Sequence, residues 1–339
     1  MISVDNFNPI ELLDCTLRDG SYAIDFQFTA SDTQSVCFAL DRAGVKWIEI
    51  GHGFGMNASS DRYGVAAATD AQYLRAAADA CSKARFGMFF IPGIGTQDHL
   101  RMAADHGMGF VRIGTNPSRI EDAKDFIILA KQLGLTVAFN AMKSYATPAT
   151  ELAQRLRQAV QWGADVVYVV DSAGCMLPSD TTAYIKRALD ACNAPVGFHG
   201  HNNLHLAVAN SLAAVSAGAR FVDSTLQGIG RSGGNAQTEV LLVVLEKLGY
   251  RLGVDFMSIF EIGDAVIAHR VPKCSGMSSL DLTIGRFHFH SSYLPLVLSV
   301  SHECQLDPRV LIEKLSSVNT ENPDIDLVRL IARDIIESQ

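Results

Sequence analysis

The feature that most limits the fold of this chain is a regular alternation of short apolar runs with longer segments of helical periodicity. Eight runs rich in β-branched or aromatic residues predict strands. They lie at Leu12–Leu17, Lys46–Ile50, Phe86–Ile91, Phe110–Ile113, Thr136–Asn140, Val166–Val170, Pro195–His199 and Phe221–Leu226. Between them, segments such as "DTQSVCFALDRAG" place apolar side chains, here Val36 and Leu40, on one helical face and end at a glycine, here Gly44.

Near-continuous apolar strands separated by helices are typical of an all-parallel sheet. An eightfold alternation favours a closed (β/α)8 TIM barrel over a doubly wound sheet. The alternation stops after the helical segment Phe256–His269, and only helical patterns follow it. We therefore predict a barrel domain over residues 1–272 and a small helical C-terminal domain over residues 273–339.

Composition excludes several classes of protein. With 339 residues, 48% of them hydrophobic, the chain can bury a large core. Its net charge of -8, without a Lys/Arg cluster, argues against a nucleic-acid or anionic-membrane surface. The seven cysteines are scattered and form no CxxC pair, which predicts reduced thiols. The sequence shows no secretion signal and no apolar run of about 18 residues, so we expect a soluble, cytoplasmic protein.

A barrel carries its chemistry at the carboxyl ends of the strands, where this sequence gathers polar side chains. His199 and His201 are two residues apart at the end of the seventh strand, on the same side of the pleat. The pair Arg18 and Asp19 follows the first strand. Two imidazoles and a carboxylate with open positions form a facial metal site, and the amide oxygen of Asn235 is a further candidate ligand. The simpler alternative is a histidine pair that bonds loop carbonyls.

Nitrogen and carboxylate ligands suit Mn²⁺, Co²⁺ or Zn²⁺ better than Mg²⁺. Such an ion can hold an α-keto acid through its carboxylate and keto oxygens and stabilise an enolate as a Lewis acid. Arg18, permanently charged and next to Asp19, is then placed to bond the enolate oxygen. The charged pair would thus be one metal ligand and one electrostatic clamp, and the plainer interpretation is a solvated end of a strand.

Two other strand ends offer candidate substrate-binding residues. Asp171 and Ser172 follow the sixth strand, although Asp171 can instead bond neighbours on the rim or orient a ligand imidazole. On the third strand Phe89 and Phe90 are adjacent. We expect one of them to face the pocket, where its bulk would limit the length of the substrate.

Several features leave alternatives open. Glu49 and His52, on the second strand, are candidates for supporting the site residues. Whether Arg112 points into or out of the barrel depends on a register that we cannot assign. The run "GIGRSG" matches a dinucleotide-binding pattern but follows the eighth strand instead of the first, so we interpret it as a flexible rim that brings Asn235 near the metal.

Several of these motifs also resemble those of a known enzyme family. The run "DCTLRDG", Asp14 to Gly20, is similar to the opening motif of the metal-dependent lyase and aldolase family of hydroxymethylglutaryl-CoA lyase type. The runs "IEIGHGFGMNASSDRYG", "IPGIG", "VVDSAG", "HGHNNLHLAVANS" and "GGNA" extend the similarity over most of the chain. The stretch after the second strand favours the branch of 4-hydroxy-2-oxo acid aldolases.

The resemblance implies a TIM barrel with a divalent ion, often Mn²⁺, on Asp19, His199 and His201. It implies a carbon–carbon lyase that releases pyruvate and an aldehyde through a metal-bound pyruvate enolate, with Arg18 stabilising the enolate. It also implies that the helical tail forms part of the active site and docks an acetaldehyde dehydrogenase.

One pair of positions departs from that family. The aldolases of this branch have a catalytic histidine two places after the glycine of the motif and a tyrosine in the tail, whereas this chain has Tyr22 and His290 at the matching positions. We hypothesise that His290 takes the proton from the 4-hydroxyl of the substrate and that Tyr22 bonds or relays it. An imidazole of pKa about 6.5 suits this task better than a phenol of about 10. The alternative is that Tyr22 only shapes the pocket.

Two other functions are kept as alternatives. A related enzyme that condenses an acyl-CoA with a keto acid would need a basic groove for the CoA phosphates, and the chain has no Lys/Arg cluster. A weakly active partner subunit of an aldehyde dehydrogenase would use its apolar tail, with Leu294 and Leu298, for docking. Whatever its function, we expect this protein to form an oligomer.

Overall fold

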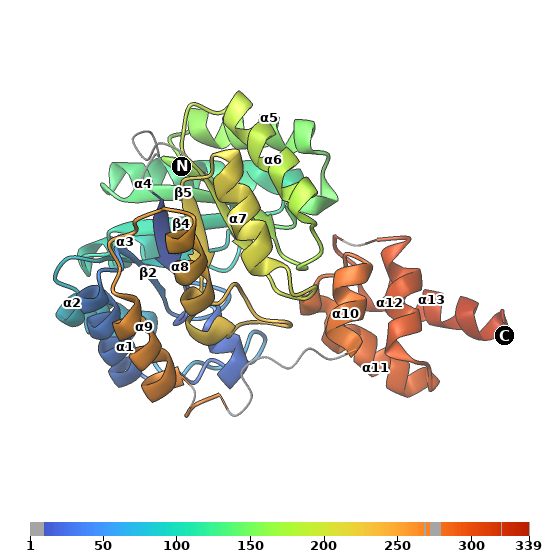
Figure 1. Cartoon of the computed structure of the whole chain (residues 1–339). Coiled ribbons are helices and arrows are strands. Elements are labelled where there is room, and N and C mark those ends of the chain that lie inside the picture. Colours follow the sequence, from blue (N-terminus) through green and yellow to red (C-terminus); the bar gives the residue numbers. More distant parts are fainter. Residues whose placement is uncertain (1–9, 268, 272–278, 320, 339) are drawn as a thin grey trace.

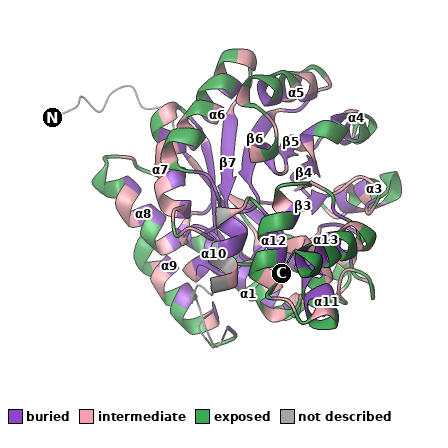
Figure 2. Cartoon of the chain, turned by 90° about the vertical axis from the view of Figure 1, so that its right-hand side faces the viewer, coloured by how far each residue is buried: buried purple, intermediate pink, exposed green. Residues whose placement is uncertain are grey.

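The structure is a computed structural model, which describes residues 10–267, 269–271, 279–319 and 321–338. Its centre is a closed barrel of eight parallel strands in chain order, with helices around the outside (Figures 1 and 2). The strands are β1 (Glu11–Asp14), β2 (Trp47–Ile50), β3 (Arg85–Phe90), β4 (Phe110–Thr115), β5 (Thr136–Ala141), β6 (Val166–Asp171), β7 (Val196–Gly200) and β8 (Phe221–Ser224). Each predicted strand overlaps an observed one, and the prediction of a (β/α)8 TIM barrel is confirmed.

Amphipathic helices cover the barrel and pack their apolar sides on the outer faces of the strands to form the main core. They are α1 (Ala30–Ala43), α2 (Asp70–Ala80), α3 (Gln97–Asp105), α4 (Lys124–Gln132), α5 (Ala149–Gln161), α6 (Pro178–Ala191), α7 (Ala207–Ala217), α8 (Thr238–Lys247) and α9 (Phe256–Ile262). α1 begins at a capping box in which the side chains of Thr29 and Asp32 bond each other's backbone N–H groups. It ends at Gly44, whose φ of 91° is the left-handed conformation that favours glycine.

The first strand ends at Asp14, earlier than predicted, because the chain turns at Cys15. The backbone N–H groups of Arg18 and Asp19 both donate to the carbonyl oxygen of Cys15. The carboxylate of Asp14 holds this turn by accepting bonds from the backbone N–H and the hydroxyl of Thr16, at 3.0 and 2.9 Å. The turn carries the charged pair over the mouth of the barrel.

A layer of buried polar side chains fills the middle of the barrel, one from each even-numbered strand: Glu49, Arg112, Tyr168 and Asp223. TIM barrels in general fill their interior with such layers from alternate strands. Arg112 on β4 is fully buried. Its side chain points into the barrel, which answers the question that the sequence left open. Its guanidinium pairs with Glu49 at 3.1 Å and with Asp223, and it lies 4.5 Å from the ring centroid of Tyr168. A Cβ at Gly197 would lie 2.5 Å from the ring of Tyr168, so the glycine leaves room for this layer.

The helical C-terminal segment has an apolar core of its own. It comprises α10 (Ser279–Arg286), α11 (Leu294–Cys304), α12 (Pro308–Ser316) and α13 (Ile325–Glu337), at the right of Figure 1. The predicted domain boundary at residues 272–273 lies outside the described residues, and the division into two domains stays a prediction.

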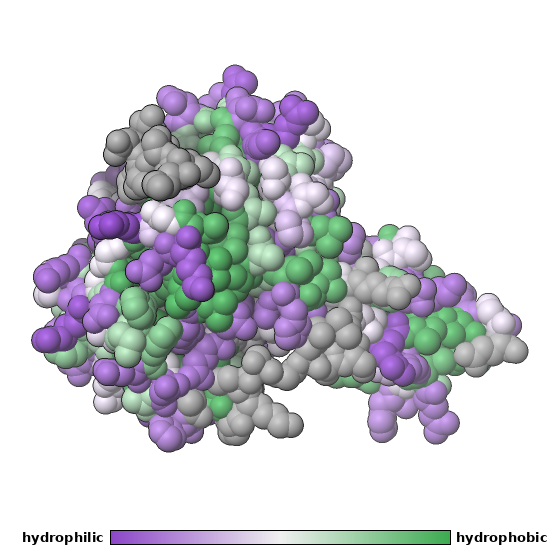
Figure 3. Space-filling model, in the orientation of Figure 1, coloured by the Kyte–Doolittle hydropathy of each residue, from purple (hydrophilic) through white to green (hydrophobic). Residues whose placement is uncertain are grey.

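Apolar side chains also gather on the outer surface over α7 and α8 (Figure 3), where Val240 and Leu248 are 47% and 53% exposed. Contiguous apolar surface is typical of interaction sites, and oligomer formation stays a prediction. None of the helices described in the structure has both the length and the apolarity of a membrane span.

Replacing Arg112 tests the charged layer inside the barrel. Arg112→Met removes the positive charge and leaves the carboxylates of Glu49 and Asp223 buried near each other. Breaking a buried ion pair in this way costs about 3–5 kcal/mol, so the free energy of unfolding in urea should fall by that amount. Arg101→Met, at an exposed ion pair with Asp98, is the control and should change it by less than about 0.5 kcal/mol. Equal losses in the two variants would contradict this account.

Candidate active site

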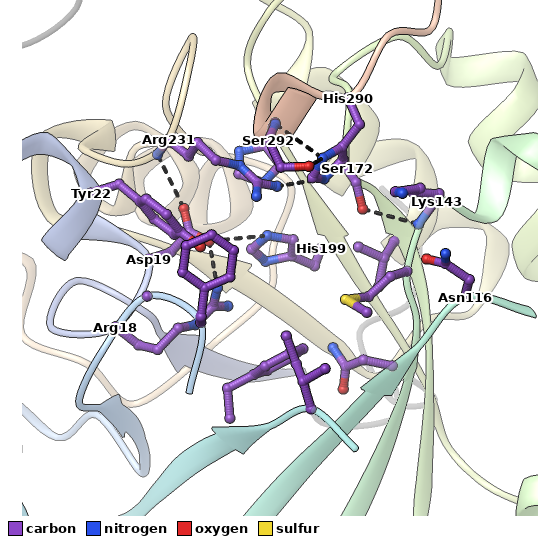
Figure 4. A pocket seen from close by; sticks show the side chains of 18 of the residues that line it. Arg18, Asp19, Tyr22, Asn116, Lys143, Ser172, His199, Arg231, His290 and Ser292 are labelled. Atoms are coloured by element: carbon purple, nitrogen blue, oxygen red, sulfur yellow. Dashed lines mark hydrogen bonds and ion pairs between the residues drawn. The ribbon is translucent and has the colours of Figure 1, made fainter. Parts of the chain in front are cut away.

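Three buried side chains meet at the mouth of the barrel. The candidate ligand atoms of Asp19, His199 and His201 all lie within 4.8 Å of one another, and Nε2 of His199 is 4.0 Å from Oδ2 of Asp19. The two histidines come from the end of β7, and Asp19 comes from the turn after β1. Figure 4 shows His199 and Asp19 facing each other across the pocket floor. The structure therefore brings together the residues that the sequence predicted as metal ligands.

Both imidazoles turn one nitrogen toward the protein. Nδ1 of His199 is 2.9 Å from a carboxylate oxygen of Asp223, and Nδ1 of His201 is 3.1 Å from the carbonyl oxygen of Gly234. Because both partners accept hydrogen bonds, each Nδ1 carries the proton and each Nε2 has a free lone pair. This arrangement is typical of metal-ligating histidines. Burial lowers the pKa of His201 to about 3, so its ring is neutral.

Asp19 is held in its ionised form. Burial would raise its pKa, but Arg18, whose Nη1 lies 2.5 Å from Oδ2, together with the two histidines and Arg231 outweighs burial and lowers it. The loop after β8 passes close by, since a Cβ at Gly230 would be 2.9 Å from Oδ1 of Asp19. Nδ2 of Asn235 donates to the same oxygen at 2.9 Å. The amide of Asn235 would therefore have to rotate before its oxygen could serve as a ligand.

The donor chemistry of this set fits a divalent transition metal. A carboxylate and two imidazoles suit Mn²⁺, Co²⁺ or Zn²⁺. A second group, Cys15 with His199 and Asp223, also meets the distance criterion for ligands. However, burial raises the pKa of the Cys15 thiol well above its usual value, and Asp223 already pairs with Arg112. The set around Asp19 is therefore the better candidate.

Arg18 is fixed between two carboxylates. Its Nε donates to Glu49 at 2.7 Å and its Nη1 donates to Asp19, while its guanidinium lies 4.9 Å from the ring centroid of Phe89. Within the described part of the chain, Nη2 has no hydrogen-bond partner, and Arg18 lines the adjoining cavity. Glu49 thus holds Arg18 in place, in agreement with the supporting role considered for it.

A cavity of about 340 Å³ lies over these groups, between the strand ends and the helical segment. Eight of the predicted site residues line it. They are Arg18, Asp19, Tyr22, Phe89, Ser172, His199, His201 and His290. The helical segment therefore contributes to the pocket through His290.

Two of the predicted substrate-binding residues do not line this cavity. The carboxylate of Asp171 accepts bonds from two backbone N–H groups of the loop after β6, at 3.0 and 2.9 Å, so it shapes that loop. Phe90 lies on the outer face of β3 and packs against Phe126. Of the two adjacent phenylalanines, Phe89 is the one that lines the pocket.

Tyr22 and His290 line the same cavity and are connected by Arg231. Nη2 of Arg231 is 2.8 Å from Nε2 of His290, and its guanidinium is 5.3 Å from the ring centroid of Tyr22. Burial, together with the charges of Arg231 and Lys143, lowers the pKa of His290 well below 6.5. Burial raises the pKa of Tyr22 to about 12. At neutral pH the imidazole is therefore neutral and the phenol is protonated.

The sequence analysis missed two charged residues of the pocket, Lys143 and Arg231. Lys143 is 5% exposed, and its Nζ donates to Oη of Tyr293 at 2.8 Å and to the carbonyl oxygen of Glu321 at 2.6 Å. Burial lowers the pKa of Lys143 to about 8. Both residues follow strand ends, and this position in the sequence could have marked them as candidate pocket residues. Nothing in the sequence, however, indicates that they contact the helical tail.

Comparisons with known proteins agree with this geometry. Residues 9–266 match the family described as HMGL-like. The chain is 40% identical over 306 residues to a 4-hydroxy-2-oxovalerate aldolase of Pelotomaculum thermopropionicum, covering 90% of each chain. It is 37% identical over 330 residues to that of Moorella thermoacetica, covering 97% of this chain and 98% of the relative.

Comparison with a solved structure also indicates an aldolase. The N-terminal domain of a Bacteroides vulgatus protein assigned as an aldolase superposes with a TM-score of 0.74 at 26% identity, and the match covers 87% of this chain and 98% of that domain. The prediction of a carbon–carbon lyase is thus confirmed at the level of the enzyme family. The chain belongs to the HMGL-like family, and along nearly its whole length it is similar to the 4-hydroxy-2-oxovalerate aldolases.

Proposed function

We propose that this chain is a divalent-metal-dependent aldolase that cleaves a 4-hydroxy-2-oxo acid into pyruvate and an aldehyde. The observation that carries the proposal is the convergence of Asp19, His199 and His201 beside Arg18 in one cavity. The names of the relatives support the substrate class, since the curated relatives described above are aldolases of 4-hydroxy-2-oxovalerate.

Asp19, His199 and His201 would hold the ion, for which we propose Mn²⁺. Bound there, it would supply a Lewis acid that accepts the negative charge developing on the keto oxygen. The two Nδ1 contacts of the histidines, to Asp223 and Gly234, orient the rings for this role.

Arg18 would bind the keto-acid end of the substrate, and Ser172 would bind the substrate on the side of the pocket where Lys143 lies. Nη2 of Arg18 is available to donate to the enolate oxygen, and its charge is permanent because Glu49 and Asp19 outweigh the effect of burial and raise its pKa. The hydroxyl oxygen of Ser172 accepts the backbone N–H of Lys143 at 3.0 Å, which leaves its own O–H free to donate to the substrate.

The proton of the 4-hydroxyl would pass to His290. Its loss lets the C3–C4 bond break, so that C4 becomes the carbonyl carbon of the aldehyde and C3 later takes a proton to give pyruvate. The neutral ring of His290 lines the cavity, and its Nε2 accepts a hydrogen bond from Arg231, so that Nε2 carries a lone pair and is the candidate basic nitrogen. Arg231 bonds that Nε2 and would have to release it as substrate enters. Tyr22, whose ring centroid lies 5.3 Å from the guanidinium of Arg231, would bond the same hydroxyl.

The helical segment is also the part of the chain for which we propose docking to an aldehyde dehydrogenase. Exposed apolar side chains on α11 and α13 support this, with Leu298 43%, Leu330 54% and Ile336 46% exposed. A cytoplasmic location is part of the same proposal, and the six cysteines of the described residues, which are unpaired, are consistent with it.

The proposed reaction is tested by pyruvate release. Metal-free protein is mixed with 4-hydroxy-2-oxopentanoate, and pyruvate is followed with lactate dehydrogenase and NADH. We expect turnover that depends on added Mn²⁺ and stops when a chelator is added, because the enolate would lose its Lewis acid. Absence of pyruvate from a panel of 4-hydroxy-2-oxo acids in Mn²⁺ would reject the aldolase.

The metal site is tested separately by calorimetric titration of Mn²⁺ into metal-free protein. We expect one binding site. Loss of a residue that only hydrogen-bonds a metal ligand weakens metal binding by about 10–100-fold. Loss of a ligand itself, in His201→Ala, should weaken Mn²⁺ binding by more than that. His302→Ala, on the exposed surface of α11, is the matched histidine control and should bind as tightly as the unchanged protein. Unchanged affinity in His201→Ala would remove this residue from the ligand set.

Kinetics of His290 variants test the proposed base. Loss of a general base costs about 10²–10⁴-fold, so kcat of His290→Ala should fall by at least about 100-fold. His288→Ala, at an exposed histidine of the same loop, should stay within a few-fold. Because the pKa of His290 is lowered, kcat/KM of the unchanged enzyme should fall only as the pH drops below about 6.5, where the base becomes protonated. Activity of His290→Ala within a few-fold would eliminate it as the base.

A further inference from the structure

Lys143 is a buried cation in the cavity wall that the proposed mechanism does not use. Its Nζ contacts two uncharged oxygens, the phenol of Tyr293 and the backbone carbonyl of Glu321. The carboxylate of Glu321 bonds the hydroxyl of Ser118 instead. Among the described residues, no carboxylate forms an ion pair with Lys143.

An ammonium group buried without a counter-charge is unfavourable, because it loses its hydration without gaining an anion. Burial accordingly lowers the pKa of Lys143, and the like charge of Arg231 adds to this effect, while the charge of Glu321, which forms no ion pair with Lys143, offsets it only in part. An anion bound in the cavity beside Lys143 would supply the missing charge. The folded protein is therefore prepared for an anionic group at this point of the pocket.

The position of Lys143 assigns that group to one end of the substrate. Lys143 follows β5, which is four strands from β1 in a closed barrel of eight and so lies across the mouth from it. Figure 4 shows Lys143 and Asn116 on the opposite side of the pocket from Arg18 and Asp19. Since the keto-acid end is assigned to the Asp19 side, the Lys143 side faces the part of the substrate that leaves as the aldehyde.

We propose that this aldehyde fragment carries a carboxylate, which Lys143 binds, with Asn116 as a neighbouring amide. This inference rests on the proposed function and narrows it to 4-hydroxy-2-oxo dicarboxylic acids. Cleavage breaks the C3–C4 bond as described above, and the products are pyruvate and an aldehyde that retains the second carboxylate. A single cation matches the charge of a carboxylate, whereas a phosphate dianion would require more donors.

Binding of uncleavable analogues tests the proposal without relying on turnover. Calorimetry in Mn²⁺ compares 2-oxohexanedioate with 2-oxohexanoate, which have the same length and differ in a terminal carboxylate or methyl group. A charge-assisted contact should favour the dicarboxylate by about tenfold or more in Kd. In Lys143→Met this ratio should fall to near one, because the cation is lost. A change that merely weakens folding affects both ligands alike and leaves the ratio unchanged.

Tyr293→Phe is the matched control, because it removes the phenol oxygen that Lys143 contacts but keeps the charge. It should retain the preference for the dicarboxylate, as should the conservative variant Lys143→Arg in large part. A ratio near one in the unchanged protein would overturn the proposal. So would an equal loss of affinity for both ligands in Lys143→Met, because the preference for the dicarboxylate would then not come from Lys143.

A parallel cleavage assay separates this proposal from the aldolase itself. The substrates are 4-hydroxy-2-oxohexanedioate and 4-hydroxy-2-oxohexanoate, with pyruvate as the readout, and the ratio of their kcat/KM values should follow the ratio of affinities. Preference for the dicarboxylate in binding, with no pyruvate from either substrate, would reject the aldolase and still support the anion site.

Discussion

The buried guanidinium of Arg112 is the charge on which the geometry of the active site depends. It pairs with both Glu49 and Asp223 inside the barrel, and each of these carboxylates also holds one group at the mouth. Glu49 bonds Nε of Arg18, and Asp223 bonds Nδ1 of His199. The proposed enolate clamp and one proposed metal ligand are thus positioned from the same buried layer. Because buried ionic groups are stable only when they are paired, this network tolerates little displacement of either group.

The charges that remain at the mouth of the barrel select the kind of ligand that fits. Asp19 is the carboxylate that lines the cavity, while Arg18, Lys143 and Arg231 are cations around it. The low polarity of a buried pocket strengthens the interaction of these charges with a bound anion. Such a pocket favours an acidic substrate over a neutral one, in agreement with the keto acids named for the relatives. Lys143 extends this preference to the far side of the cavity.

The sequence predicted the fold well, because eight buried strands and their amphipathic helices produce strong periodic patterns. It also predicted Asp19, His199 and His201 as one set, since strand ends of a barrel meet at one mouth. It failed at the end of β1, where the hydrogen bonds of Asp14 to Thr16 replace strand pairing with a turn. Local apolar character continued past that turn and gave no sign of it.

Periodicity and strand-end chemistry, both local properties, were thus enough to determine the barrel and its candidate metal ligands. Tertiary structure alone decided the direction of Arg112, because a shift of one residue in strand register would turn its side chain to the other face. It also decided which residues the helical segment brings to the pocket, among them Tyr293 beside Lys143 and His290 beside Arg231. These contacts join residues far apart in the chain, and no local pattern encodes them, since they form only when the segment packs over the barrel.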